Sequence, residues 1–389
     1  MQAENEAPST SMVHELCCAK YIALMSQGIT RRITALFLVV LFLLGLPYAG
    51  LFFLAEVPPA FFEFPPRALY IAHEPFSWIA FSIYLFLILI LFVLGLKIAI
   101  PRLRSLRIPN AGPFPICGWI GVGLMLASWG IAWSRLEVFA PLQSHTFFPL
   151  WLGYIFLANA AAEARSGYSS LRAYGWSYVL LFPASAMFWW TFEYLNRFVQ
   201  NWSYQASLTL SETEYFLWAT LSFSTVLPAV LATKEWIQSF FVDNEFTSTS
   251  AIQSYCGSIT HAVMVVCASL LLLCLGIFPN ALFPAVWVAP LLLIYSFDSL
   301  LIKNGFCFKA SQDQGIELLV WAVAALFSGV FWEMWNFWSF PKWIYHVPYV
   351  NAFYVFEMPV LGFAGYLPFG IFCGAIISLF GFRAKVRSL

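Results

Sequence analysis

Two stretches of the chain carry the same pair of chemically capable side chains at the same spacing. Glu193 and Asn196 form one Glu-x-x-Asn pair, and Glu333 and Asn336 form a second pair 140 residues later. In a helix, side chains at i and i+3 share a face, so each asparagine amide can donate a hydrogen bond to the neighbouring carboxylate. Each stretch therefore holds a compact acid–amide pair, suited to proton transfer or to recognition of a polar group.

Both glutamates fall near the C-terminal ends of predicted helices, where the helix dipole disfavours the ionised carboxylate. Such a group is either protonated or compensated by a hydrogen-bond donor or a cation. Glu357 follows at the predicted start of the next helix, in Phe356-Glu-Met-Pro359, where the dipole favours the ionised form. Two carboxyls in contrasting surroundings are a common acid and base arrangement. We therefore predict a catalytic site with Glu333 as proton donor, Glu357 as base or cation partner and Asn336 as the orienting group.

The second copy carries more polar chemistry than the first. In the first copy, Leu217 stands at the position that corresponds to Glu357. Glu193 and Asn196 are therefore interpreted as a simpler duplicate of the site formed by Glu333, Glu357 and Asn336. The alternative role for both pairs is structural, as a tie between helix ends at the membrane interface. Beyond Asn336 three residues form a candidate outer-loop lid over the acids, or else interfacial anchors: Lys342, Tyr345 and His346.

The composition indicates that these residues lie in a membrane protein. Hydrophobic residues make up 61% of the 389-residue chain and charged residues 10%, against roughly 25% charged in soluble proteins; mean hydropathy is +0.79. About 20 helical residues cross a hydrocarbon core about 30 Å thick. Ten such apolar runs can be placed, at Ile33–Leu54, Phe76–Ile98, Phe114–Trp133, Phe147–Ala162, Ala173–Asn196, Tyr215–Ala232, His261–Phe278, Leu282–Ile302, Ile316–Phe340 and Tyr354–Phe380.

The positive charges predict the orientation, because lysine and arginine in short loops stay on the cytoplasmic side. With ten crossings, fifteen of the 19 lysines and arginines fall on one side, which also holds both chain ends. Both termini are therefore predicted to be cytoplasmic, in the cell (inner) membrane. The two Glu-x-x-Asn pairs then lie near the outer surface.

The offset of 140 residues also relates Leu227-Pro228 to Leu367-Pro368, so the similarity extends beyond one helix. Each copy holds four predicted spans, and an even number returns the chain to its starting side, which makes the copies parallel rather than inverted. We predict an all-α polytopic membrane protein of about ten transmembrane helices, with two parallel four-helix pseudo-repeats after two N-terminal helices. The predicted segments are a cytoplasmic N-terminal segment (1–32), two helices with a basic loop (33–112), repeat one (113–233), a cytoplasmic linker (234–260), repeat two (261–380) and a basic cytoplasmic tail (381–389).

No cofactor and no metal are expected. The histidines lack the spacing of a helical metal pair, although carboxylate and amide oxygens suit a hard cation such as calcium. Walker, Gly-x-Ser-x-Gly and dinucleotide-binding motifs are missing from the sequence. The basic run from Lys97 to Arg107 flanks an apolar span and is interpreted as a topology determinant or an anionic-lipid contact, so no nucleic-acid partner is expected.

Three functions fit these residues. The first is an enzyme or binding protein for a membrane lipid or a hydrophobic small molecule such as an isoprenoid, because few polar groups stand among aromatic walls such as Phe331–Phe340. The second is a proton- or cation-coupled transporter or channel subunit, which needs polar residues at several depths, whereas the span centres are nearly all apolar. The third is a non-catalytic subunit with a membrane-protein partner. The first is favoured, and the sequence does not decide whether the protein is an enzyme.

Overall fold

The computed structural model describes residues 30–31, 33–54, 56–103, 112–240, 258–302 and 312–382. The predicted basic tail from 383 onward, the N-terminal segment 1–29 and most of the predicted linker lie outside the described residues. The described helices after the first are α2 (Trp78–Leu103), α3 (Ile116–Trp133), α4 (Ala140–Gln143), α5 (Phe147–Ser166), α6 (Ser170–Tyr174), α7 (Leu181–Asn196), α8 (Glu212–Phe223), α9 (Val226–Gln238), α10 (Ser258–Leu273), α11 (Pro279–Leu282), α12 (Ala285–Ile302), α13 (Gln312–Phe337) and α14 (Tyr366–Leu379).

Short elements connect these helices. The 3₁₀ turns are η1 (Leu51–Phe53), η2 (Pro59–Phe62), η3 (Glu137–Phe139), η4 (Gly175–Leu180), η5 (Gln205–Leu208) and η6 (Val360–Gly365). The strands are β1 (Trp202–Tyr204), β2 (Trp343–Tyr345), β3 (Tyr354–Val355) and β4 (Met358–Pro359), paired as β1 with β2 and β3 with β4. The predicted all-α class is therefore confirmed, with two small antiparallel pairs added.

Within the described residues, 7 helices are long and apolar enough to cross a membrane: Ile33–Phe53, Trp78–Pro101, Ile116–Trp133, Phe147–Ser166, Glu212–Gln238, Gly315–Phe337 and Val360–Leu379. Two shorter apolar helices are Ser258–Leu273 and Ala285–Leu301. The protein is thus an integral membrane protein by length and apolarity of its helices. The figure of ten crossings stays a prediction.

The predicted span Ala173–Asn196 is not one continuous helix. It is divided among α6, η4 and α7, and Gly175 turns the chain with φ of +51° at the division. α7 has 16 residues, which is roughly 24 Å of helix and less than the hydrocarbon core. Glu193 therefore stands on a short helix, whereas Glu333 stands on α13, which has 26 residues.

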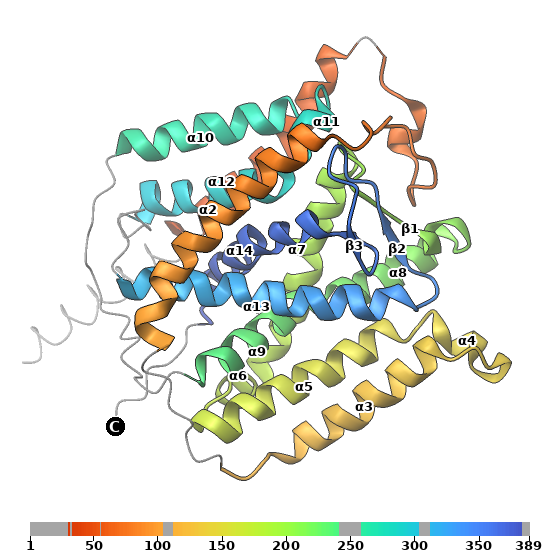
Figure 1. The fold of residues 1–389 in the computed structure, drawn as a ribbon, viewed down its shortest axis with the longest axis vertical. Helices are drawn as coiled ribbons and strands as arrows, with labels where there is room; N and C mark the ends of the chain where they lie inside the picture. The colour runs from red at the N-terminus through yellow and green to blue at the C-terminus, as the bar shows by residue number, and fades with distance from the viewer. Residues whose placement is uncertain are drawn as a thin grey trace, which may run out of the picture.

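The helices pack as pairs around a central group. α3 packs on α5, α10 packs on α12, and α13 contacts both α9 and α14. Figure 1 shows the α10–α12 pair and the α3–α5 pair at opposite ends of the long axis, with α13 and α14 between them. The two outer pairs flank the helices that carry the glutamates.

Glycine permits the close contact between α3 and α5. A Cβ atom added at Gly121 would lie 2.6 Å from the carbonyl oxygen of Gly153, and one added at Gly153 would lie 2.6 Å from the backbone nitrogen of Met125. Side chains at either position would force the two backbones apart, because a packed interior resists overpacking.

We expect Gly121→Leu to destabilise the protein by about 1–3 kcal/mol, the usual cost of overpacking a core. Gly123→Leu on the same helix is the matched control, since nothing lies within 4 Å of a Cβ atom there. The unfolding midpoints of both variants in one detergent measure the difference. Equal midpoints would show that the α3–α5 contact does not depend on glycine.

β1 and β2 form a two-stranded antiparallel sheet, here called the aromatic ribbon, that joins distant parts of the chain. Trp202 pairs with Tyr345 and Tyr204 pairs with Trp343, on either side of the central Ser203↔Ile344 pair. Because side chains alternate along a strand, these four aromatic residues share one face. Figure 1 shows the ribbon near the C-terminal end of α13, and this end of the bundle is called the ribbon end.

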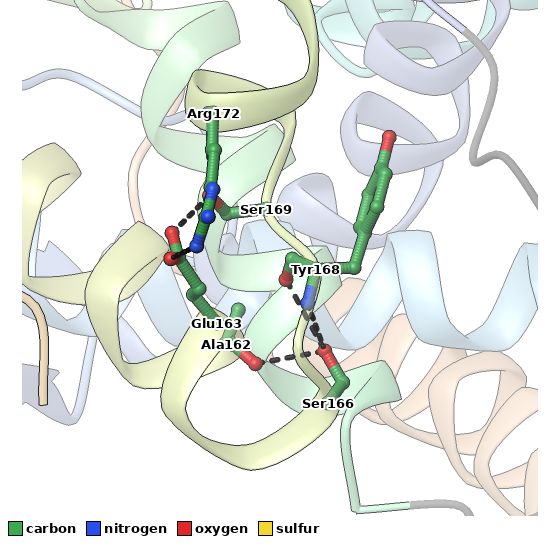
Figure 2. A network of polar contacts seen from close by, with 6 residues as sticks. All are labelled: Ala162, Glu163, Ser166, Tyr168, Ser169 and Arg172. Atoms are coloured by element: carbon green, nitrogen blue, oxygen red, sulfur yellow. Dashed lines mark hydrogen bonds and ion pairs between the residues drawn. The ribbon is translucent and has the colours of Figure 1, made fainter. Parts of the chain in front are cut away.

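The corner between α5 and α6 lies at the opposite end of α5 from the α4 connection, and Figure 2 shows its contacts. Glu163 forms an ion pair with Arg172 at 2.5 Å and accepts a hydrogen bond from the Ser169 hydroxyl at 3.1 Å. The Ser169 hydroxyl also accepts from the backbone N–H of Arg172 and so caps α6. Gly167 ends α5 with φ of +72°, a left-handed conformation that glycine adopts without a steric cost.

Candidate functional site

Each asparagine of the repeated pairs binds the backbone of the ribbon. Asn196 Nδ2 donates to the carbonyl oxygen of Trp202 at 2.8 Å, and Asn196 Oδ1 accepts from the N–H of the same residue at 3.3 Å. Asn336 makes the same two bonds with Trp343, both at 2.9 Å. The i and i+3 spacing suggests a hydrogen bond from each amide to the neighbouring glutamate. The amides bind the backbone instead, because the chain folds back over each helix end and offers backbone partners there.

Glu193 accepts hydrogen bonds from three aromatic side chains. Its Oε1 receives the indole N–H groups of Trp189 at 2.8 Å and Trp202 at 3.1 Å, and the hydroxyl of Tyr204 at 2.7 Å. Trp189 stands one turn earlier on the same helix, whereas the other two donors come from β1. The ribbon therefore supplies most of the polar partners of this carboxyl.

Glu333 has a similar but less complete set of partners. Its Oε1 accepts from the hydroxyls of Tyr345 and Tyr366, each at 2.7 Å, and the indole N–H of Trp343 donates to Tyr345 at 3.0 Å. The side chain is fully buried, with an exposed fraction of 0%. Within the described residues its buried Oε2 atom has no hydrogen-bond partner.

The aromatic donors form part of the repeat that the sequence reasoning missed. Trp202-Ser-Tyr204 begins 6 residues after Asn196, and Trp343-Ile-Tyr345 begins 7 residues after Asn336. One extra residue in the second copy shifts the offset from 140 to 141, so a comparison at fixed offset does not align them. The pattern Glu-x-x-Asn, followed six or seven residues later by Trp-x-Tyr, is the signal that would have found them.

Glu357 lies in the turn of the β3–β4 pair and not in the first turn of a helix. Phe356 has φ of +58°, which reverses the chain so that Tyr354 pairs with Pro359. The next helical element begins only at Val360. The predicted stabilisation of Glu357 by a helix dipole is therefore wrong; a direct ion pair with the ammonium of Lys342 compensates its charge instead.

The structure brings most of the predicted site residues together. Glu357 is close enough to act electrostatically on Glu333, and Lys342 and Tyr345 from the candidate lid contact Glu357 and Glu333 respectively. His346 points elsewhere, because its Nε2 lies 2.9 Å from the Ser203 hydroxyl. Whether the segment opens as a lid stays a prediction.

His346 belongs to a contact between the loops of the ribbon end. Its ring stacks on that of His73 with 6.0 Å between centroids, and His73 Nε2 lies 3.0 Å from the carbonyl oxygen of Val199. Burial lowers the pKa of both histidines, and their proximity lowers the pKa of His346 further. The neutral forms of both rings therefore suit this contact.

We expect acidification to loosen the contact between these loops. The unfolded chain takes up protons near the usual histidine pKa of about 6.5, whereas His73 and His346 in the folded protein have lowered pKa values. Stability should therefore be complete above that pH and should decline below it, toward the lowered pKa values. Unfolding midpoints measured at about pH 7.5 and about pH 5.5 test this. His346→Asn should weaken the dependence.

The described residues contain no group of three or more histidine, cysteine, aspartate or glutamate side chains that could hold a metal ion. No family model matches the chain, and no curated protein and no solved structure matches it either.

Proposed function

We propose that this integral membrane protein binds a hydrophobic or lipid-like molecule and transforms it by acid/base chemistry at the ribbon end. Glu333 is the proton donor and Glu357 the base or cation partner. The observation that carries the proposal is the asymmetry of the Glu333 carboxyl: one oxygen accepts two tyrosine hydroxyls, and the other has no partner among the described residues. A buried polar atom without a partner costs roughly 1–3 kcal/mol, which a ligand at that atom would offset.

The two tyrosines also determine which oxygen can act as the acid. Tyr345 and Tyr366 both donate to Oε1, so the hydrogen of the protonated Glu333 carboxyl sits on Oε2. That hydrogen is then free to move to a substrate atom. Trp332 and Phe369 flank Tyr366, and aromatic walls around few polar groups suit an apolar substrate with one reactive point.

Asn336 acts as a positioning residue in this scheme. Its side chain holds the backbone of Trp343 at the start of β2, and Tyr345 stands two residues later on the same strand. The asparagine thereby fixes the tyrosine that holds Glu333. Asn196 holds β1 in the same way, which makes Glu193 and Asn196 the second copy of the arrangement.

We also infer that the two copies belong to parallel halves, 113–233 and 261–380. The order of elements supports this, because α3, α4 and α5 precede the first pair as α10, α11 and α12 precede the second. The ribbon supports it too, since its register exchanges equivalent aromatic residues about the Ser203↔Ile344 pair. With both termini cytoplasmic in the cell (inner) membrane, the ribbon end faces outward.

A proton- or cation-coupled transporter or channel subunit is the second candidate. It is favoured by a buried polar cluster away from the ribbon end, in which Thr233 Oγ1 lies 2.7 Å from the Tyr154 hydroxyl and 3.1 Å from Ser328 Oγ. These residues come from α9, α5 and α13. A transport path needs polar groups at several depths. Ser328 of this cluster lies five residues before Glu333 on α13, which places the cluster at a second depth.

Comparison of lipid extracts by mass spectrometry tests the first candidate. Cells that express the wild-type protein, the Glu333→Gln variant or neither are extracted in parallel. We expect at least one lipid-like species to change with the wild-type protein and not with the variant. If the three extracts agree while both proteins accumulate in the membrane, the proposed chemistry is wrong.

A further inference from the structure

A pocket of about 510 Å³ opens at the ribbon end beside the C-terminus of α13. Two cationic side chains, Arg135 and Lys342, line it together with the aromatic rings of Phe337, Trp338 and Phe340. The three rings are 38%, 53% and 60% exposed, so the apolar lining continues onto the surface of the bundle. Positive charge and exposed apolar surface thus meet in one cavity.

Arg135 has hydrogen-bonding capacity left over. Its guanidinium donates to the carbonyl oxygens of Trp338 at 2.7 Å and Ser134 at 3.1 Å, and lies 5.3 Å from the centroid of the Trp338 ring. A guanidinium has five N–H donors, so these two bonds leave three for a ligand. Within the described residues no carboxylate forms an ion pair with Arg135, whose positive charge is therefore uncompensated there.

Lys342 joins this pocket to the proposed acid/base site. Its ammonium forms an ion pair with Glu357 and lies 5.8 Å from the ring centroid of Phe337. Glu357 balances the charge of Lys342, so Arg135 gives the pocket a net positive charge. An oxyanion in this pocket would pair with Arg135. It would share the pocket with Lys342, whose ion-pair partner Glu357 is the proposed base.

We propose that this pocket binds the anionic head group of the lipid-like substrate, with Arg135 holding phosphate or carboxylate oxygens and the apolar chain lying over the exposed aromatic rings. Arginine suits this task because its planar fork matches two oxygens of such a group. The inference rests on the proposed function and gives its substrate a class: an amphiphile with an acidic head. The source of the acidic group is a lipid and not a free anion, because aromatic side chains make up much of the lining.

Calorimetric titration of the full-length protein in a non-ionic detergent tests the assignment. The probes are dioctanoyl phosphatidylglycerol, dioctanoylglycerol, which lacks the phosphate, and inorganic phosphate. We expect the phospholipid to bind more tightly than either of the others. Equal affinity for dioctanoylglycerol would overturn the role of the anion, and equal affinity for inorganic phosphate would overturn the role of the lipid chain.

Matched variants locate the binding site. Arg135→Gln is expected to weaken phosphatidylglycerol binding about tenfold or more, the range of a charge-assisted hydrogen bond, and Arg135→Lys should weaken it less. Arg67→Gln is the control, because Arg67 is an exposed arginine that hydrogen-bonds Leu210 away from the pocket. Loss of binding in both glutamine variants to the same extent would contradict the site.

The same titration on Glu333→Gln separates this inference from the proposed function. Intact phospholipid binding by a variant that no longer alters the lipid extract would support both. A wild-type protein that alters the extract but does not bind the phospholipid would overturn the head-group site alone. A protein that binds the phospholipid through Arg135, while Glu333→Gln alters the extract as the wild type does, would overturn the acid/base function alone.

Discussion

A Glu333→Gln variant is expected to fold normally and to lose turnover by about a hundredfold or more, the smaller end of the usual contribution of a general acid. Glutamine has the same shape, and its carbonyl oxygen can still accept from Tyr345 and Tyr366. Its amide group cannot release a proton as an acid does. Turnover of the lipid-like species that the extracts identify, measured in reconstituted vesicles, gives the fold-change.

Glu193→Gln is the matched control for that experiment. Glu193 is also buried and also accepts tryptophan and tyrosine donors, so both variants remove one buried acid from equivalent surroundings. We expect a much smaller loss of turnover from Glu193→Gln, because the sequence position that corresponds to Glu357 at the 140-residue offset holds leucine, Leu217, in that copy. Equal losses would assign the chemistry to both copies, and normal turnover in Glu333→Gln would exclude Glu333 as the donor.

Asn196→Ala is expected to lower the free energy of unfolding by about 2–6 kcal/mol, since each of two buried polar groups left unpaired costs roughly 1–3 kcal/mol. The variant leaves both the N–H and the carbonyl of Trp202 without their partner. Trp202 is 5% exposed, so water cannot replace those bonds without opening the ribbon. Asn336→Ala should cost less, because Trp343 is only partly buried.

Asn280→Ala is the control for the asparagine experiment. Asn280 also binds backbone with both side-chain atoms, to the Glu74 N–H at 3.2 Å and the Ala72 carbonyl at 2.9 Å, but these bonds are exposed. Water can take the place of the lost side chain there, so we expect less than about 1 kcal/mol. Denaturant titration in mixed micelles measures all three variants. An equal loss of unfolding free energy in Asn280→Ala would show that burial of the ribbon does not cause the loss expected for Asn196→Ala.

Sequence reasoning found the acids of the site but assigned wrong partners to the amides. Its helical i and i+3 rule correctly groups Glu333 with Asn336 on α13, yet the amide binds Trp343, seven residues later. Such a contact depends on the path of the chain after the helix ends. The helical spacing of residues does not predict that path. The failure at Glu357 has the same origin, because a left-handed Phe356 places a strand turn where Pro359 suggested a helix start.

Composition and the length of the apolar runs predict the class of this protein and the helical character of its spans, because both respond directly to the hydrocarbon solvent. The repeated Glu-x-x-Asn pattern adds the two acids. The hydrogen-bond partners of those acids are evident only in the folded chain. The aromatic ribbon pairs Trp202 with Tyr345 across 143 positions of sequence. Its indole N–H and tyrosine hydroxyl groups donate hydrogen bonds to the two carboxyls near the helix ends. Hydrogen bonds are short and directional, so they depend on where the folded chain places each donor and not on the spacing of residues along it.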